Sequence, residues 1–233
     1  GLSEGVFWDF LSHEPAYPLL EDMGISRELL ADVVPTFGPQ GELTDAAADR
    51  MGLHPGIPVT YRAGDQPNNA LSLNVLEQGE VAATAGTSGG MCGVSDSIQF
   101  DPESRVNSFA HVNHEKERTR LTVLLCVNGT GIAYAWLRRM MGQVMDYSGM
   151  NVLAGNAPVG SDGLLFHPFG NGAERLLKNH DPGAGFSGLQ FNRHDTAHLC
   201  RAVQEGIAFA MNYGLEVMRS IGVQPKVVRA GHA

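Results

Sequence analysis

One acidic residue and one glycine-rich stretch have the composition that phosphoryl transfer requires. Asp65 follows an apolar, strand-forming run at 58–63, and a second strand pattern further along the chain leads into Gly86–Gly90. A carboxylate can take a proton from an attacking hydroxyl group, and successive backbone N–H groups in a glycine-rich turn can hold phosphate oxygens. The two features together indicate chemistry on a phosphate group.

Asp65 has two interpretations, and the sequence supports both. Pro67 follows two residues later and favours a helix start, where an aspartate commonly caps the free N–H groups. A carboxylate at the carboxyl end of a strand also lies where α/β sheets present catalytic groups. One side chain can fill both roles, so a helix that begins near Asp65 is compatible with catalysis.

The stretch Gly86–Gly90 also has more than one interpretation. It formally matches G-x-S-x-G, the turn that carries the nucleophile of serine hydrolases, but that turn joins a strand to a helix. The next residues here, Met91–Val94, continue an extended pattern and predict a hairpin instead. The hairpin tip is either a plain β-turn or a phosphate-binding loop, in which glycine permits close approach and positive φ angles. The GxxxxGK[ST] pattern of a P-loop does not occur.

Two weaker candidates lie further along the chain. Gly129 and Gly131 flank a predicted helix start, which can face phosphate or ribose, but tight helix–sheet packing explains the same glycines. His111 and His114 are three residues apart; on a strand that spacing would direct their side chains to opposite faces, which does not favour a shared metal ion. We therefore assign no metal ligands from the sequence.

The composition is that of an ordinary globular chain. Its 233 residues are 43% hydrophobic and 18% charged, and the formal net charge is −9. The sixteen lysines and arginines form no basic stripe, which argues against a nucleic-acid partner. No apolar run approaches the roughly 18 residues that cross a bilayer, and no signal-peptide pattern opens the chain, so we expect a cytoplasmic protein with no membrane contact. The widely spaced Cys92, Cys126 and Cys200 are expected to be reduced, buried thiols.

The elements that must position these residues follow from capping residues and hydrophobic spacing. Ser26 and Thr44 are placed to cap two short helices in a proline-rich approach segment. The predicted strands are 59–63, 80–84, 90–94, 108–112, 120–127, 162–167 and 226–230. The predicted helices start near Pro67 and at Gly129–Gly131, and the longest runs from Asp195 to Ile221. This order predicts an α/β fold, a mixed sheet with helices packed on it.

Five stretches, in order along nearly the whole chain, resemble the carboxy-terminal half of carbohydrate kinases of the FGGY family, most closely the xylulokinases. They are Ala63–Gln66, Thr84–Gly89, Gly163–Pro168, Asp181–Leu189 and Leu199–Phe209. An ordered series is more specific than any one motif. The resemblance implies an actin-like ATPase fold, in which two ribonuclease-H-like domains enclose a cleft for a sugar and ATP.

The resemblance also implies roles for individual residues. Asp65 matches the catalytic base, which contacts the sugar and takes the proton from its attacking hydroxyl. The phosphate-binding loop is matched by Gly86, Thr87, Ser88 and Gly89. Gly131 lies where a glycine lines the nucleotide site, and Gly231 begins a loop beneath the adenosine. ATP and Mg²⁺ are the implied cofactors.

Two departures from the family pattern concern the nucleotide and the sugar. His232 replaces a glycine in the adenosine loop. Residues 170–175 match the family's usual Gly-Glu-Arg motif less well. The resemblance further implies that residues 1–56 form a linker-like helical segment from a first domain. Residues 57–233 would then be the carboxy-terminal kinase domain, incomplete at its end, and this chain by itself is expected to be inactive.

The expected reaction is phosphorylation of a small ketose by ATP, with D-xylulose giving D-xylulose 5-phosphate as the first choice. Kinases for glycerol, gluconate or ribulose remain alternatives, as does a catalytically silent sugar- or nucleotide-binding regulator on the same fold. A homodimer is compatible with the sequence, which does not determine the oligomeric state.

Overall fold

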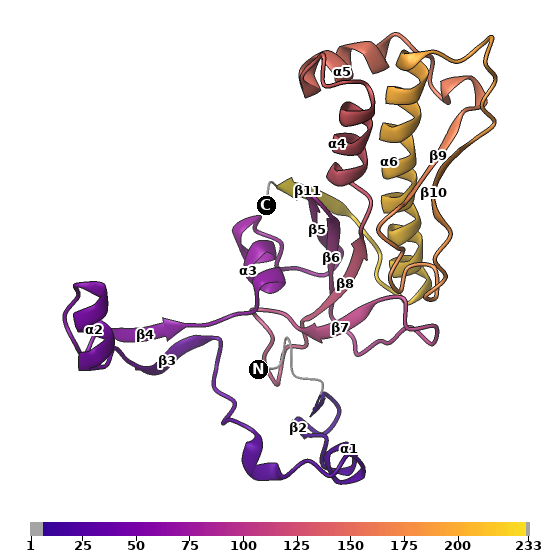
Figure 1. The fold of residues 1–233 in the computed structure, drawn as a ribbon. Coiled ribbons are helices and arrows are strands. Elements are labelled where there is room, and N and C mark those ends of the chain that lie inside the picture. The colour runs from indigo at the N-terminus through magenta and orange to yellow at the C-terminus, as the bar shows by residue number, and fades with distance from the viewer. Residues whose placement is uncertain (1–6, 232–233) are drawn as a thin grey trace.

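A five-stranded mixed sheet forms the centre of the computed structural model, which describes residues 7–231 (Figure 1). Its strands are β5 (Glu80–Ala85), β6 (Gly89–Ser95), β7 (Asn107–Ala110), β8 (Leu121–Val127) and β11 (Val227–Gly231). The strand order is β11-β5-β6-β8-β7. Only β11 runs parallel to its neighbour, β5, and the other neighbours are antiparallel. The mixed sheet predicted from the sequence is confirmed.

Two helices cover opposite faces of this sheet, α3 (Asp65–Ser72) and α6 (Thr196–Ser220) (Figure 1). Successive residues of a strand point to opposite faces, and β6 shows this clearly. Cys92 packs with Ala70 of α3, whereas Met91 packs with Met218 of α6. The sheet is therefore buried on both sides, which explains why β6 reads as a continuous apolar and glycine-rich run.

A second hydrophobic cluster forms beside α6. It joins α6 to α4 (Gly131–Met140), α5 (Tyr147–Gly155) and the hairpin of β9 (Leu165–Phe169) and β10 (Gly183–Ser187). Only some of the apolar residues in and after α4 are buried. Leu137 is buried, but Met140 at the end of the helix is 64% exposed, and Val144, four residues beyond it, is 79% exposed. Helical spacing located the helix, and the packing partners decided which of its apolar residues are buried.

The segment before α3 forms an arm beside the sheet (Figure 1). Its elements are β1 (Trp8–Asp9), β2 (Glu14–Pro15), α1 (Tyr17–Asp22), the 3₁₀ turn η1 (Arg27–Leu29), β3 (Phe37–Glu42), α2 (Asp45–Met51) and β4 (Pro58–Tyr61). Ser26 and Thr44 cap η1 and α2 as predicted, although η1 is a single turn. The strand at 58–61 pairs with β3 in a separate two-stranded ribbon, so it is not part of the main sheet.

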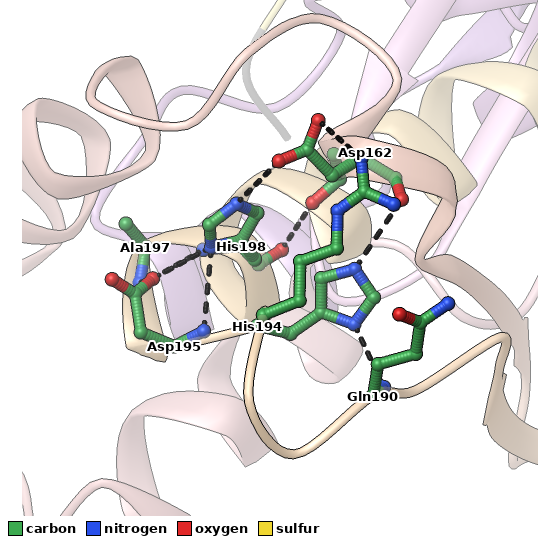
Figure 2. Close-up of polar contacts among 8 residues, drawn as sticks. Asp162, Gln190, His194, Asp195, Ala197 and His198 are labelled. Atoms are coloured by element: carbon green, nitrogen blue, oxygen red, sulfur yellow. Dashed lines mark hydrogen bonds and ion pairs between the residues drawn. The ribbon is translucent and has the colours of Figure 1, made fainter.

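The start of α6 is fixed by a capping box. The Asp195 carboxylate accepts hydrogen bonds from the backbone N–H groups of Ala197 (2.9 Å) and His198 (3.2 Å), and Asp195 is therefore the N-cap of α6. Figure 2 shows the His198 ring between two carboxylates: Nδ1 lies 2.8 Å from Asp195 Oδ1, and Nε2 lies 3.4 Å from Asp162 Oδ2. Asp162 belongs to the 3₁₀ turn η2 (Ser161–Gly163), not to the strand predicted there.

The three cysteines and His111 lie within the packed parts of the fold. All three cysteines are free, with Cys92 and Cys200 buried and Cys126 half-buried. His111 is buried, with Nδ1 2.7 Å from Thr122 Oγ1 and Nε2 2.9 Å from the Val75 carbonyl. Across residues 7–231, no helix combines the length and the apolar content that a bilayer crossing needs.

Candidate functional site

The glycine-rich stretch forms the turn of the β5–β6 hairpin. Ala85 and Gly89 are the last paired residues, and Gly86, Thr87 and Ser88 form a bend between them. Because β6 continues as a strand, the hairpin prediction is confirmed and the nucleophile-elbow interpretation is wrong. Thr87 and Ser88, at the tip of the turn, are exposed.

The start of α4 packs directly on this turn. The backbone N–H of Gly131 donates to the Gly86 carbonyl (3.0 Å), and that of Ile132 donates to the Thr87 carbonyl (3.1 Å). A Cβ atom at Gly131 would lie 2.4 Å from the Gly86 oxygen, so only glycine fits here. The first N–H groups of α4 are thus occupied by the turn. Close packing, rather than a helix end directed at a ligand, explains this glycine.

An open pocket of about 400 Å³ adjoins the turn and α4. Its lining consists of Gly86, Thr87, Gly131, Ile132, Tyr134, Ala135 and Tyr147. The rings of Tyr134 and Tyr147 are stacked with centroids 6.0 Å apart. The Tyr134 hydroxyl is held by the Gln204 side-chain amide at 2.9 Å. The volume lies within the range of roughly 300–1,000 Å³ that small-molecule sites occupy.

Asp65 is the first residue of α3. Gly64, not Asp65, is the N-cap, so the capping interpretation of Asp65 is wrong in detail. Its Oδ1 accepts a hydrogen bond from the Gln66 backbone N–H (2.6 Å), and its side chain is exposed. The strand before it belongs to the β3–β4 ribbon. Asp65 is therefore presented by the start of a helix and not by a strand end of the main sheet.

Asp65 and the turn lie toward the same end of β5 and β6. Gln66 Oε1 is 3.6 Å from Cys92 Sγ, and a Cβ atom at Gly90 would lie 3.8 Å from the same oxygen. Burial raises the pKa of the Cys92 thiol to about 12, and the negative charge of Asp65 adds to this shift. The start of α3 thus rests over β6, close to the point where that strand leaves the turn.

Gly231 lies apart from the pocket lining. It pairs with Thr84 at the end of β11, and a Cβ atom there would lie 2.8 Å from Leu73 Cδ2. Packing against the residue that follows α3 is therefore one reason for glycine at this position. His232 and Ala233, the rest of the adenosine loop named above, lie outside the described residues.

Sequence reasoning missed three residues at this site, Thr130, Tyr134 and Tyr147. Thr130 is only 1% exposed, and its hydroxyl donates to the Gly86 carbonyl (3.1 Å). Its place between two glycines at a helix start was the available signal. Among the described side chains, no group of three or more histidine, cysteine, aspartate or glutamate residues is arranged to hold a metal ion.

No family model matches the chain, but individual proteins do. It is 30% identical over 216 residues to a gluconokinase of Bacillus subtilis (strain 168), covering 88% of this chain and 40% of that protein. It is 25% identical over 226 residues to a xylulose kinase of Klebsiella pneumoniae, covering 96% of this chain and 45% of that protein. The chain therefore spans less than half the length of these relatives.

Solved structures of sugar kinases have the same fold as this chain. A xylulose kinase from Rhodospirillum rubrum superimposes with a TM-score of 0.85 at 27% identity, covering 97% of this chain and 45% of that one. A gluconate kinase from Lactobacillus acidophilus superimposes with a TM-score of 0.85 at 20% identity, which supports the fold alone. With its mixed sheet and its β5–β6 turn, the chain has the actin-like ATPase fold, and over less than half of their length it is homologous to gluconokinases and xylulose kinases, which are FGGY carbohydrate kinases.

Proposed function

We propose that the protein containing this chain transfers the γ-phosphate of ATP to a hydroxyl group of a small sugar, with D-xylulose as the first candidate. The observation that supports this most is the placement of an exposed carboxylate, Asp65, toward the same strand end as the Gly86–Gly89 turn. For phosphoryl transfer a protein must mainly position the two substrates, supply a base and stabilise the charge on the phosphate group. These two elements supply a base and a set of donors.

In this proposal Asp65 accepts the proton of the attacking hydroxyl group. Its carboxylate has one hydrogen-bond donor within the described part of the chain, the Gln66 N–H at 2.6 Å, which leaves the second oxygen available to a substrate hydroxyl. A general base must lie within about 3 Å of the proton that it takes. Because Asp65 is exposed, this contact is expected to form when the cleft closes around the sugar.

The nucleotide is assigned to the turn and to the pocket beside α4. Gly86, Thr87, Ser88 and Gly89 are proposed to contact phosphate oxygens, and Gly131 to line the site, as its place in the pocket suggests. Thr87 and Ser88 are exposed, so the turn is accessible to phosphate groups, and Gly131 has no side chain, which leaves room beside the turn for the rest of the nucleotide. Mg²⁺ typically binds through phosphate oxygens, waters and one or two carboxylates, so ATP with Mg²⁺ is compatible with the few acidic groups near the turn.

Replacing Asp65 with Asn tests the assignment of the base. In the protein from the complete reading frame, Asp65→Asn should lower kcat by about 100-fold or more, the usual contribution of a general base, and leave the KM for the sugar within a few-fold. A coupled assay for ADP release measures both values. Asp45→Asn, in the first turn of α2 on the arm, is a matched control. Near-normal turnover of Asp65→Asn would remove Asp65 from the mechanism.

Gluconate is the second candidate substrate, because the Bacillus subtilis relative at 30% identity is a gluconokinase. ADP release should be measured with D-xylulose, gluconate, glycerol and ribulose as separate acceptors. The largest kcat/KM identifies the acceptor. Sugar binding without ADP release for every acceptor would instead support a silent binding protein on this fold.

A further inference from the structure

The β5–β6 turn has an unusual arrangement of carbonyl groups. Both the Gly86 and the Thr87 carbonyls accept hydrogen bonds from the start of α4, through the N–H groups of Gly131 and Ile132. In an extended strand, successive carbonyls point to opposite sides. Two consecutive carbonyls directed at one helix therefore define a specific bend of the chain.

This bend also fixes the direction of two N–H groups. In a trans peptide the carbonyl of one residue and the N–H of the next point in opposite directions. The Thr87 N–H shares its peptide plane with the Gly86 carbonyl, and the Ser88 N–H shares its plane with the Thr87 carbonyl. Because both carbonyls face α4, both N–H groups face away from it. Successive N–H groups directed to one side form an anion-binding concavity.

Thr130 holds this arrangement with a buried side chain. Its hydroxyl lies 3.1 Å from the Gly86 oxygen and 3.4 Å from the Thr87 oxygen, so one donor is directed at both carbonyls. Its methyl group fills the space beside Gly89, where a Cβ atom would lie 2.5 Å from Thr130 Cγ2. Both branches of the side chain are therefore used by the turn.

The local geometry of Thr130 favours a role in the turn over a role in the helix. A threonine at an N-cap normally accepts a hydrogen bond from an N–H in the first turn of its own helix. Thr130 is the N-cap of α4 but makes no such bond, and its φ and ψ angles are −93° and −103°. The hydroxyl that would cap α4 is instead directed to Gly86 and Thr87.

We propose that Thr130 is a positioning residue for phosphate binding. Its hydroxyl, with the first two N–H groups of α4, keeps the Gly86 and Thr87 carbonyls turned inward, so that the Thr87 and Ser88 N–H groups face the phosphate groups of a nucleotide. The start of α4 supports the phosphate-binding turn from behind and does not contact the anion itself. This inference rests on the proposed function of the turn.

Two substitutions separate the hydroxyl from the rest of the side chain. Thr130→Val keeps the shape and removes the donor, and Thr130→Ser keeps the donor. Thr122→Val is a matched control, because Thr122 is also fully buried and its hydroxyl bonds to His111 on a distant part of the sheet. In the complete protein, Thr130→Val should raise the KM for ATP by about tenfold, the effect of losing one buried hydrogen bond. The KM for the sugar should stay within twofold, and Thr130→Ser should restore the KM for ATP.

A binding measurement on the 233-residue chain tests the same inference without turnover. Titration with millimolar tripolyphosphate, followed by amide NMR, should shift the Thr87 and Ser88 resonances in the wild type and in Thr130→Ser, and require at least tenfold more ligand in Thr130→Val. The same response in Thr130→Val and wild type would overturn the proposal, as would a wild type in which these two amides do not shift. A complete protein without kinase activity whose amides respond as expected would reject the proposed function and still support the role of Thr130.

Discussion

Glycine occupies several positions where another part of the backbone passes too close for a side chain. A Cβ atom at Gly206, in the middle of α6, would lie 2.3 Å from the Phe166 carbonyl oxygen of β9. This close approach lets α6 lie directly against β9, and the β9–β10 hairpin closes the hydrophobic cluster beside it. The glycine is therefore set by a contact between elements and not by the local conformation of the helix.

Two opposing effects predict the result of Gly206→Ala. Helix propensity favours alanine by about 1 kcal/mol. The clash is with a backbone atom that cannot rotate away, and overpacking of this kind costs about 1–3 kcal/mol. We expect the clash to prevail and the free energy of unfolding, measured in urea, to fall. Gly155→Ala, at the end of α5 with no atom within 4 Å of the new Cβ, is the control and should be neutral or slightly stabilising. Equal stability of both variants would contradict this account of the packing.

Residue-scale prediction worked where the information is local. The turn at Gly86–Gly89 could be recognised because glycines separate two strand patterns, and Asp65 because it follows an apolar run before a helix start. Thr130 and Tyr147 could not be recognised in this way. Thr130 acts on residues 44 positions earlier in the chain, and Tyr147 reaches the pocket only because the start of α5 brings its ring against that of Tyr134 in α4. Contacts of that kind leave no periodic pattern in the sequence.

At the scale of elements, the start of α6 is joined to η2 by an ionic network (Figure 2). His198 lies between Asp195 and Asp162, and Arg193 Nη2 lies 3.2 Å from Asp162 Oδ1. His194 Nε2 approaches the Asp162 carbonyl at 3.4 Å. When His198 is protonated, both ring nitrogens donate to carboxylates. These bonds raise the pKa of His198 above its usual 6.5. The hydrogen bond to Asp195 has the largest effect, and the hydrogen bond to Asp162 adds to it.

This network predicts a pH-dependent contribution to stability. Because the folded pKa of His198 is raised, its contribution is complete below about pH 6.5 and is lost as the pH rises through the folded value. The hydrogen bond from His198 lowers the pKa of Asp195 below 3.8. The contribution of ionised Asp195 to stability is therefore lost in acid, as the pH falls through this lowered pKa. The loss of unfolding free energy in His198→Ala should therefore be larger at pH 5 than at pH 8. His180→Ala, outside the network, should show no such difference, and equal losses for His198→Ala at both pH values would exclude the ionic role.

Element prediction succeeded where caps and spacing agree. Asp195 and the apolar residues that follow it located α6 within one residue of its observed limits, Thr196–Ser220. The strand β10 (Gly183–Ser187) was missed because its glycines carry little strand signal, and its conformation depends on pairing with β9. The strand β3 was missed for the same reason, since it contains Gly38, Pro39 and Gly41, whereas its partner β4 was predicted as a strand at 59–63.

At the scale of the whole molecule, the two segments proposed from the sequence, 1–56 and 57–233, meet within the β3–β4 ribbon, where Glu42 pairs with Pro58. The ribbon therefore connects the approach segment to α3 and Asp65. We propose that its position influences how Asp65 is presented to a substrate, because only Arg62–Gly64 separate β4 from α3.

The 233-residue chain on its own is predicted to show no sugar-dependent ADP release. Asp65 and the turn residues Thr87 and Ser88 are exposed in it, and water competes for the donors and the base unless a closed cleft excludes it. The assay is ADP release with D-xylulose or gluconate at millimolar concentrations, with the complete protein as the positive control. Sugar-dependent release above the no-sugar background would refute the prediction.

The parallel pairing of β11 with β5 also affects how the protein is made. Glu80 and Arg229, which bond across this pair at 2.8 Å, are 149 positions apart in sequence, whereas β5, β6, β7 and β8 lie within residues 80–127. During translation the four antiparallel strands emerge from the ribosome together, and long-range parallel pairing closes slowly. The edge of β5 therefore stays unpaired on the nascent chain until β11 has been synthesised, and through that interval it is the part of the sheet most open to capture by a chaperone or by another copy.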